Sequence, residues 1–330
     1  MNTLFILDPI KKLDPEWDSS LYVLKALWAR GHSVFFAEAG SIKEEKGRVL
    51  AKVSEAGVDH LPRQKSPSFR QLLAARTILK PAGDFQTMEA FDLVVLRPEP
   101  PFDEAYRRLT SLLEAPAQKI PIVNHPRGIR NTNEKMAILN FPEIIPETII
   151  SNSPETILIF QRQIESDLVI KPLYEKGGKG VFLLKRGETH AAGLLKEATA
   201  SGKTSVVAQE FIPLKKDHGD KRITLLNGEI LCVYEKWPPP GDFRSNLGLG
   251  GTAHRTEITD EDKKIVERIK PYLLKEGLYW VGLDVLEGRL LEMNVTCPAG
   301  ISEAEELQPE HRYVEALADF LEGLSRKPRN

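Results

Sequence analysis

The sequence has few cysteines, no long apolar run and no excess of charge of one sign. Its two cysteines, Cys232 and Cys297, are too few for a disulfide framework or a thiolate metal site, and they suit a reducing compartment. Nowhere do about 18 apolar residues occur together, which excludes a membrane-spanning helix. The opening MNTLFILDPI lacks a basic region and is broken by Asp8 and Pro9, so we expect a strand and no signal peptide. We therefore expect a cytoplasmic protein with no membrane partner.

The charges are balanced and the chain is long. Its 45 Lys and Arg residues and 47 Asp and Glu residues leave a net charge of −2. This balance provides no basic field that would hold a polyphosphate backbone, so we expect no nucleic-acid partner and only local binding of anions. A length of 330 residues predicts two or three packed lobes.

The first lobe, expected at 1–124, alternates between strand and helix patterns. An apolar strand at Leu4–Leu7 is followed by an amphipathic helix at Ser19–Ala29 and a second strand at Ser33–Ala37. This alternation is typical of a parallel sheet covered by helices. The other elements expected here are a hairpin after Gly40, a helix near Phe69–Ile78, strands at 91–96 and 120–124, and a helix at 104–113.

Two further lobes are expected at 125–210 and 211–330, and both mix helices with antiparallel strands, as in α+β proteins. The loop at 237–251 contains so much glycine and proline that its own packing cannot order it, and we expect it to be mobile. The expected helices are 134–139, 154–165, 190–200, 260–276 and 309–324, and the expected strands are 167–171, 181–184, 205–211, 223–226, 230–235, 280–286 and 290–294.

A glycine-rich turn follows the strand that ends at Lys171. In IKPLYEKGGKG, the glycines Gly177, Gly178 and Gly180 allow backbone N–H groups to approach phosphate oxygens, and Lys171 adds a positive charge. A simple hairpin turn would use the same residues. The segment has no Gly-Lys-Ser/Thr and no following helix, so it is not a strand-to-helix phosphate loop.

A hairpin near the C-terminus carries oxygen ligands on buried-looking strands. Glu292 and Asn294 are two residues apart and point to one face, and the hairpin brings Asp284 opposite them. Three such oxygen donors suit Mg²⁺ shared with a triphosphate. The alternative is the polar face of an amphipathic hairpin, but buried strands rarely carry unpaired acids, so we favour the metal.

The segment VAQEFIP (207–213) is an apolar strand end that leads into a polar linker between two lobes. Such an extended segment can read the adenine edge with backbone groups, while Gln209 or Glu210 meets the amino group. Taken alone, it is only a strand end.

In order and approximate spacing, these motifs resemble the ATP-grasp superfamily. Along nearly the whole chain they resemble the bacterial glutathione synthetases within it. The resemblance implies an ATP-grasp fold with an N-terminal parallel-sheet domain at 1–124, a central lid domain at 125–210 and a C-terminal domain at 211–330. The segments that carry it are LDPI (7–10), DSS (18–20), RPEPPFD (97–103), VNHPRGIRNTNEK (123–135), VIKPL (169–173), GDKR (219–222), RSNLGLGG (244–251), VGLD (281–284) and EMNVT (292–296).

The resemblance also implies a reaction and its ligands. A carboxylate is activated by ATP as an acyl-phosphate and then attacked by an amine, here γ-glutamylcysteine and glycine giving glutathione, ADP and phosphate. The partners are thus small molecules, a dipeptide acid and an amino acid, and the family commonly forms homo-oligomers. The implied nucleotide contacts are Lys135, Lys171, Gly177, Gly178, Gly180 and Gln209, Glu210, Phe211 and Ile212; the implied ligands of Mg²⁺, or of Mn²⁺ in its place, are Asp284, Glu292 and Asn294.

Two arginines have catalytic roles by the same resemblance. Arg222 would stabilise charge on the transferred phosphoryl group, and Arg244, in the mobile loop, would close over the intermediate and exclude water. Substrate contacts are expected from Arg97, because polar loops at strand ends bind ligands in open α/β sheets. Asp18, Ser19 and Ser20 form either an ordinary helix N-cap or a site whose free N–H groups bind a substrate carboxylate.

The chain departs from the family where the family usually has arginines. Ser302 stands at one position, and Lys236 and Trp237 stand at the entry to the mobile loop. Neither residue type copies the planar fork of arginine. These changes leave ATP binding untouched but permit a different acid and amine pair, and a non-catalytic nucleotide-binding regulator is a third alternative. Cys297 and His125 are interpreted as packing and structural residues.

Overall fold

The structure, a computed structural model, describes most of the chain. No helix among the described residues is long and apolar enough to cross a membrane. The helix predicted near Phe69–Ile78 lies outside the described residues. The structure describes residues 1–9, 12–13, 18–55, 83–175, 177–215 and 218–326.

A five-stranded sheet forms the core of the N-terminal part. Its strands lie in the order β5 (Ser54–Glu55), β2 (Ser33–Glu38), β1 (Asn2–Leu7), β7 (Leu93–Leu96) and β8 (Ile122–Val123). The last four are parallel neighbours, and β5 is antiparallel to β2. Their continuous apolar runs are buried on both faces, as parallel strands require. The predicted parallel sheet is therefore confirmed.

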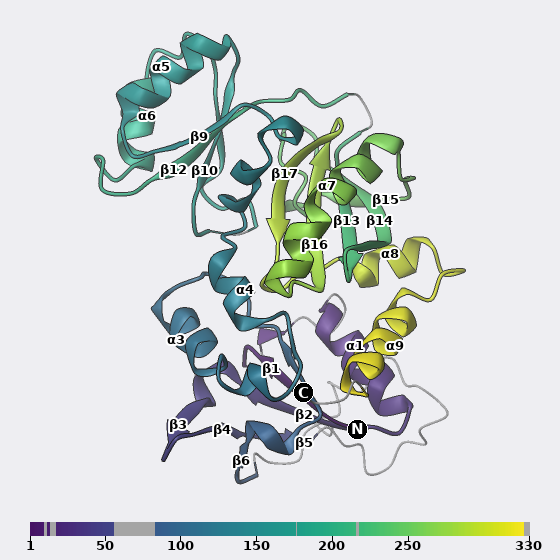
Figure 1. The fold of residues 1–330 in the computed structure, drawn as a ribbon. Helices are drawn as coiled ribbons and strands as arrows, with labels where there is room; N and C mark the ends of the chain where they lie inside the picture. The colour runs from purple at the N-terminus through teal and green to yellow at the C-terminus, as the bar shows by residue number, and fades with distance from the viewer. Residues whose placement is uncertain (10–11, 14–17, 56–82, 176, 216–217, 327–330) are drawn as a thin grey trace.

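Helices cover both faces of this sheet (Figure 1). Leu27 packs with Phe5 in one core, while Leu109 packs with Leu4 and Ile6 in another, because successive strand residues point to opposite faces. The accompanying elements are α1 (Ser19–Ala29), α3 (Glu104–Leu112), α4 (Pro126–Asn131) and a small sheet of β3 (Lys43–Glu45), β4 (Arg48–Lys52) and β6 (Phe85–Thr87).

A second, four-stranded sheet forms a lobe of its own, drawn at the upper left of Figure 1. Its apolar face packs on two helices through Ile157, Phe160 and Leu195. The sheet order is β11 (Phe182–Leu184), β10 (Leu168–Pro172), β12 (Val206–Glu210) and β9 (Thr148–Ser151), and the helices are α5 (Pro154–Ile164) and α6 (Ala191–Ala198).

A third sheet is antiparallel throughout and holds the predicted acidic hairpin. Three helices follow from the same part of the chain: α7 (Asp260–Glu276), α8 (Ile301–Leu307) and α9 (Tyr313–Ser325). The strand order is β15 (Thr252–His254), β14 (Glu229–Trp237), β13 (Asp220–Leu226), β16 (Trp280–Leu286) and β17 (Arg289–Asn294).

Two predicted elements differ from the structure for local reasons. The helix expected at 134–139 is only a short 3₁₀ turn at Ala137–Asn140. The Asn133 side chain accepts hydrogen bonds from the backbone N–H groups of Lys135 and Met136, which makes a turn where the helix was expected. The single helix expected at 309–324 begins at Tyr313, and the preceding α8 was not predicted.

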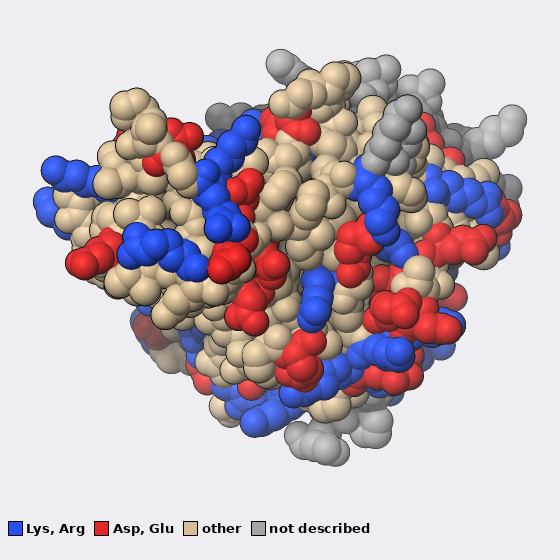
Figure 2. Space-filling model, turned by 90° about the horizontal axis from the view of Figure 1, so that it is seen from above, with Lys and Arg blue, Asp and Glu red and all other residues tan. Residues whose placement is uncertain are grey.

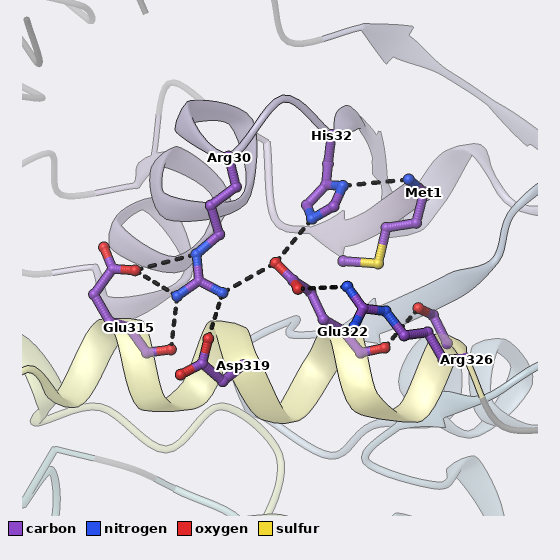
Figure 3. Close-up of polar contacts among 8 residues, drawn as sticks. Met1, Arg30, His32, Glu315, Asp319, Glu322 and Arg326 are labelled. Atoms are coloured by element: carbon purple, nitrogen blue, oxygen red, sulfur yellow. Dashed lines mark hydrogen bonds and ion pairs between the residues drawn. The ribbon is translucent and has the colours of Figure 1, made fainter. Parts of the chain in front are cut away.

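The last helix, α9, returns to the N-terminal sheet and lies beside α1 (Figure 1). Arg30, just after α1, meets three carboxylates of α9 (Figure 3). Its guanidinium contacts Glu315, lies 2.7 Å from Asp319 Oδ1 and lies 3.0 Å from Glu322 Oε1. His32 Nε2 lies 2.9 Å from the same Glu322 oxygen. One cation thus joins the end of α1 to α9.

Replacing Arg30 with methionine is expected to lower the free energy of unfolding by about 2 kcal/mol, because three carboxylates on one helix then lose their common cation while the network stays partly open to solvent. Urea unfolding followed by circular dichroism measures this change. Lys263→Met is the matched control, because it removes a single exposed pair with Asp260 and should leave the midpoint unchanged. Equal midpoints for the two variants would contradict a stabilising role for the contacts between Arg30 and α9.

Candidate active site

A cleft of about 790 Å³ lies between the second and third sheets. Both sheets and the loops between them contribute to its walls, and basic and acidic side chains are interspersed on the face seen in Figure 2. Of the predicted nucleotide and metal residues, only Gly180 does not line it, and a Cβ at that glycine would lie 2.8 Å from Pro172 Cγ. The predicted residues that line the cleft are Lys135, Lys171, Gly177, Gly178, Gln209, Glu210, Phe211, Ile212, Arg222, Arg244, Asp284, Glu292 and Asn294.

Strand pairing places the predicted metal residues on one face of the third sheet. Asp284 is opposite Glu292 across the hairpin, Gly282 is opposite Asn294, and Arg222 of β13 is opposite Asp284 on its other side. The absence of a side chain at Gly282 matters, since a Cβ there would lie 2.9 Å from the Arg222 guanidinium. The hairpin therefore presents its oxygen atoms beside a buried cation.

Asp284 is held as an anion by two cations. Arg222 Nε lies 2.9 Å and Lys236 Nζ lies 2.7 Å from the same oxygen, Asp284 Oδ1. Burial alone would raise the pKa of Asp284, but the charges of Arg222 and Lys236 hold it well below its usual value. A cleft carboxylate that stays ionised is a suitable ligand for a cation.

The donor set fits a hard divalent cation. Two carboxylates and one amide oxygen are the kinds of ligand that Mg²⁺ and Mn²⁺ accept. Asn294 donates its Nδ2 hydrogens to Gly282 O at 3.3 Å and Asp284 Oδ2 at 3.2 Å, which leaves its carbonyl oxygen as an acceptor. The third donor of this set is an amide, and the described residues contain no group of three His, Cys, Asp or Glu side chains suited to a metal.

Two lysines enter the cleft near the glycine-rich turn. Lys171 Nζ donates to Gln209 Oε1 at 2.7 Å, and Gln209 is oriented by a bond from its Nε2 to Thr148. Lys135 Nζ donates to Glu175 O at 2.6 Å. Burial lowers the pKa of Lys171, although nearby carboxylates such as that of Glu292 oppose the shift, so the negative charge of phosphate oxygens would further favour the ammonium form. The Gln209 side chain thus supports Lys171 at the wall of the cleft.

The glycine-rich turn and the loop at 238–251 meet over the cleft. Arg244 donates to Gly178 O at 3.2 Å, and a Cβ on Gly178 would lie 2.7 Å from Asn246 Oδ1. Within the loop, Arg244 NH2 lies 2.7 Å from Asp242 Oδ2, and this pairing lowers the Asp242 pKa to about 2. The predicted loop is therefore held by contacts with another lobe. The guanidinium of Arg244, which would meet an anion, is paired with Asp242 in this structure.

Three charged residues that were not among the predicted site residues organise this region. Glu134 accepts hydrogen bonds from the backbone N–H groups of Val295 and Thr296 at 2.9 and 3.1 Å, which connects the NTNEK and EMNVT segments. Burial and the nearby Glu292 raise the Glu134 pKa. Lys236 and Asp220 are the other two, and Lys236 Nζ lies 2.6 Å from Asp220 Oδ2. Only Lys236 offered a signal, as a charged residue on a largely apolar strand, since Asp220 begins a strand with two further charges and Glu134 lies in a turn.

Asn124 attaches the end of the N-terminal sheet to the third sheet. Its Nδ2 donates to Trp280 O at 2.6 Å and Val295 O at 2.8 Å. Its Oδ1 accepts from the N–H groups of Tyr279 and Trp280, both at 2.8 Å. All four hydrogen-bonding positions of one buried amide are used, so Asn124 orients the strands that carry the acidic residues.

A second cavity, of about 620 Å³, lies beside the cleft and is lined by Asp18, Ser19 and Arg97. Asp18 caps α1 by accepting from Ser20 N at 2.8 Å, which agrees with the N-cap interpretation. Arg97 is 3% exposed, donates to Ser20 Oγ and lies over the Trp280 ring at 3.8 Å. Among the described residues, its NH1 and the Ser19 hydroxyl have no hydrogen-bond partner. Both residues line the second cavity.

The two cavities share one wall. Cys297 lines both, and burial raises its thiol pKa well above the usual value, so the packing interpretation is favoured over a nucleophile. Ser302, at the start of α8, is buried and donates to Glu303 at 2.7 Å. His125 caps α4 through a bond from Arg127 N, in keeping with a structural role. The residues that line both cavities are Glu99, Pro100, Pro101, Cys297 and Ala299.

Two protein-family models match consecutive parts of the chain. The prokaryotic glutathione synthetase N-terminal domain matches residues 1–130, and the prokaryotic glutathione synthetase ATP-grasp domain matches residues 134–309. Curated relatives match over almost the whole chain. The glutathione synthetase of Thermosynechococcus vestitus is 36% identical and covers 93% of this chain and 95% of its own. That of Bradyrhizobium diazoefficiens is 34% identical and covers 91% of each.

Solved structures with low sequence identity show the fold. D-cycloserine synthetase DcsG is 16% identical, covers 97% of this chain and 99% of its own, and has a TM-score of 0.63. The ATP-grasp ligase PsnB, solved with a phosphomimetic variant of its minimal precursor, Mg and ADP, is 16% identical, covers 99% of each chain and has a TM-score of 0.61. These similarities confirm the predicted ATP-grasp fold.

Proposed function

Because the chain belongs to the prokaryotic glutathione synthetase family, whose ATP-grasp members are ATP-dependent ligases, we propose that it joins the cysteinyl carboxylate of γ-glutamylcysteine to the amino group of glycine. The observation that carries this proposal is the cleft itself, in which an acidic hairpin, two lysines and Arg222 face one space. Phosphoryl transfer needs alignment and charge neutralisation more than it needs a covalent nucleophile. The lining residues supply both.

In the first step, a carboxylate oxygen of the donor attacks the γ-phosphorus of ATP. The bond from that phosphorus to the bridging oxygen breaks, ADP leaves with the electron pair, and an acyl-phosphate forms. Lys135, Lys171 and the backbone of Gly177 and Gly178 hold the triphosphate, and Arg222 faces the moving phosphoryl group. Asp284, Glu292 and Asn294 would hold a magnesium ion, which would supply positive charge to the phosphate oxygens.

In the second step, the amino nitrogen of glycine attacks the acyl carbon. The carbon–oxygen bond to phosphate breaks and phosphate leaves with the electron pair. The nitrogen, which attacks as the free amine, gives up one proton to phosphate or solvent and keeps the other as the amide N–H. Water would compete with the amine, so the loop that carries Arg244 and the glycine-rich turn must cover the intermediate. The contact between Arg244 and Gly178 supports this closure.

We assign the second cavity to the glutamyl end of the donor. The shared wall at Cys297 lets one extended molecule place its reacting carboxylate in the cleft and its other end in the cavity. The unpaired NH1 of Arg97 and the Ser19 hydroxyl suit a carboxylate, while Asp18 suits an ammonium group. Ser20 contributes by fixing Arg97.

The proposal predicts that purified protein releases ADP from Mg-ATP only when γ-glutamylcysteine and glycine are both present. A coupled ADP assay measures the rate, and mass spectrometry identifies glutathione. Each substrate omitted singly is the control. ADP release with a different acid and amine, but not with this pair, would mean that the protein is a ligase of the proposed type with other substrates. No release with any pair, despite ATP binding, would support the regulator and overturn the ligase.

A further inference from the structure

Glu99 lies in the wall that the cleft shares with the second cavity. Among the acidic residues of the described chain that line either space, it is the one that lines both. The Cys297 thiol, which also lines both spaces, makes a hydrogen bond to the Glu99 side chain. The carboxylate itself is therefore at the shared wall, where the two spaces meet.

The backbone around Glu99 is fixed in position. Its N–H group donates to Asp8 Oδ2 at 2.8 Å, at the end of the first strand of the N-terminal sheet. Pro98 and Pro100 flank it and restrict the backbone on both sides. The Tyr106 hydroxyl donates to Pro98 O at 3.2 Å. These contacts hold the carboxylate in a defined place at the wall.

The shared wall is where the proposed amide bond would form. With the glutamyl end of the donor in the second cavity and its reacting carboxylate in the cleft, the acyl carbon lies just past the wall on the cleft side. The amino group of glycine must approach this carbon. In neutral solution that group is an ammonium ion without a free electron pair, so it must be bound as a cation and must lose a proton before it attacks. A carboxylate beside the acyl carbon can do both.

The other acidic residues line only one of the two spaces each. Asp284 and Glu292 belong to the proposed metal site on the third sheet. Glu134 accepts hydrogen bonds from two backbone N–H groups of the segment after that sheet. Asp18 caps α1 inside the second cavity and is assigned to the ammonium group of the donor. Location therefore singles out Glu99 as the carboxylate for the incoming amine.

We propose that Glu99 binds the ammonium group of the incoming amino acid and accepts the proton that frees its electron pair. The nitrogen then forms its bond to the acyl carbon as the carbon–oxygen bond breaks and phosphate leaves with the electron pair. The nitrogen gives a second proton to phosphate and keeps the third as the amide N–H, and Glu99 returns its proton to solvent. This inference rests on the proposed function, because it needs an acyl-phosphate beside the wall.

Two competing explanations give Glu99 no part in handling the amine. In the first, the residue only holds Cys297 and the shape of the wall. In the second, it binds the ammonium group of the donor. Both explanations predict that loss of the carboxylate impairs the reaction with every acceptor to the same extent, whereas the proposal predicts a loss that depends on the charge of the acceptor.

Hydroxylamine distinguishes these explanations, because it is largely uncharged at neutral pH and attacks an acyl-phosphate without first losing a proton. The protein is given Mg-ATP and γ-glutamylcysteine with either glycine or hydroxylamine, and glutathione or the hydroxamate is measured. For Glu99→Gln we expect the rate of glutathione formation to fall by about 100-fold or more, the range of general base catalysis. The rate of hydroxamate formation should stay within about threefold of the wild type, because neither ATP nor the donor loses a contact.

Three variants serve as controls. Glu99→Asp keeps a carboxylate, set back by one methylene group, and should recover part of the glutathione rate. Cys297→Ala removes the thiol contact but keeps the carboxylate, so the ratio of the glutathione rate to the hydroxamate rate should match that of the wild type. Glu310→Gln makes the same chemical change in an exposed carboxylate that pairs with Arg255, and it should leave both rates unchanged.

An equal loss of glutathione and hydroxamate in Glu99→Gln would overturn the proposal, as would a wild-type rate of glutathione formation in that variant. The same defect in Cys297→Ala would show that Glu99 acts only through the wall. Should Glu99→Gln fail to melt cooperatively, Glu99→Ala replaces it and is judged by the same ratio. If the wild-type protein forms neither product, the proposed function fails along with this inference; if it forms both and Glu99→Gln does so in the same ratio, only the role of Glu99 fails.

Discussion

Replacing Asp284 with asparagine is expected to reduce turnover on the order of 10³-fold, the range seen when one charge-stabilising group is removed from an active site. The substitution keeps the shape of the side chain but removes one negative charge from the proposed metal site. In the wild type, Arg222 and Lys236 both bond to the same carboxylate oxygen of Asp284. In the variant, these two cations lie next to a neutral amide. Steady-state ADP release measures the loss.

A second measurement shows whether the loss comes from the metal. Electron paramagnetic resonance measures the binding of Mn²⁺ in the presence of saturating ADP. This binding should weaken strongly in Asp284→Asn and in Glu292→Gln. Asp319→Asn is the matched control: it is the same chemical change in a carboxylate on α9, which pairs with Arg30, and it should retain wild-type turnover and Mn²⁺ binding. Near-normal rates in Asp284→Asn would refute the metal assignment.

Replacing Asn124 with aspartate is expected to lower the free energy of unfolding by about 4 kcal/mol at neutral pH, which is a large part of the stability of an ordinary domain. The new carboxylate could still accept from the N–H groups of Tyr279 and Trp280, but it could not donate to the carbonyl oxygens of Trp280 and Val295. Those oxygens would lose their donor and face a buried negative charge. Thermal and urea unfolding measure the change.

Asn152→Asp provides the matched control for that prediction. Asn152 also donates its side-chain amide to a backbone carbonyl, that of Gly202, but does so at the exposed surface, where water replaces the bond. We expect its unfolding midpoint to stay close to that of the wild type. A similar small effect for Asn124→Asp would mean that the connection between the N-terminal and third sheets contributes little to stability.

Local patterns were sufficient for most of the elements and for part of the site. The apolar runs at Leu4–Leu7 and 91–96 indicated buried strands, and the alternation of strands with helices indicated that the sheet is parallel. The spacing of Glu292 and Asn294 placed both side chains on one face, and the hairpin turn brought Asp284 opposite them. These inferences needed only the period of a strand and the closure of one short turn.

Charged residues on distant segments were harder to interpret from their neighbours in sequence. Lys236 was noted as a departure beside Trp237, but nothing within β14 indicates that its ammonium group meets Asp284. Glu134 likewise follows a polar segment, and its bonds to Val295 and Thr296 span more than 150 residues. In both cases the partner lies on another segment of the chain.

The sequence by itself determined which segments form strands and helices, which side chains share a face of the acidic hairpin, and which residue types are available for phosphate and metal. Only the tertiary structure decided which charges face one another: the order of β14, β13 and β16 puts Lys236 beside Asp284, and Asn124 fixes the N-terminal sheet against that group. The physical reason is the separation along the chain over which each effect acts. Periodicity and turn chemistry act over a few residues, whereas pairing between strands depends on the packing of the whole chain.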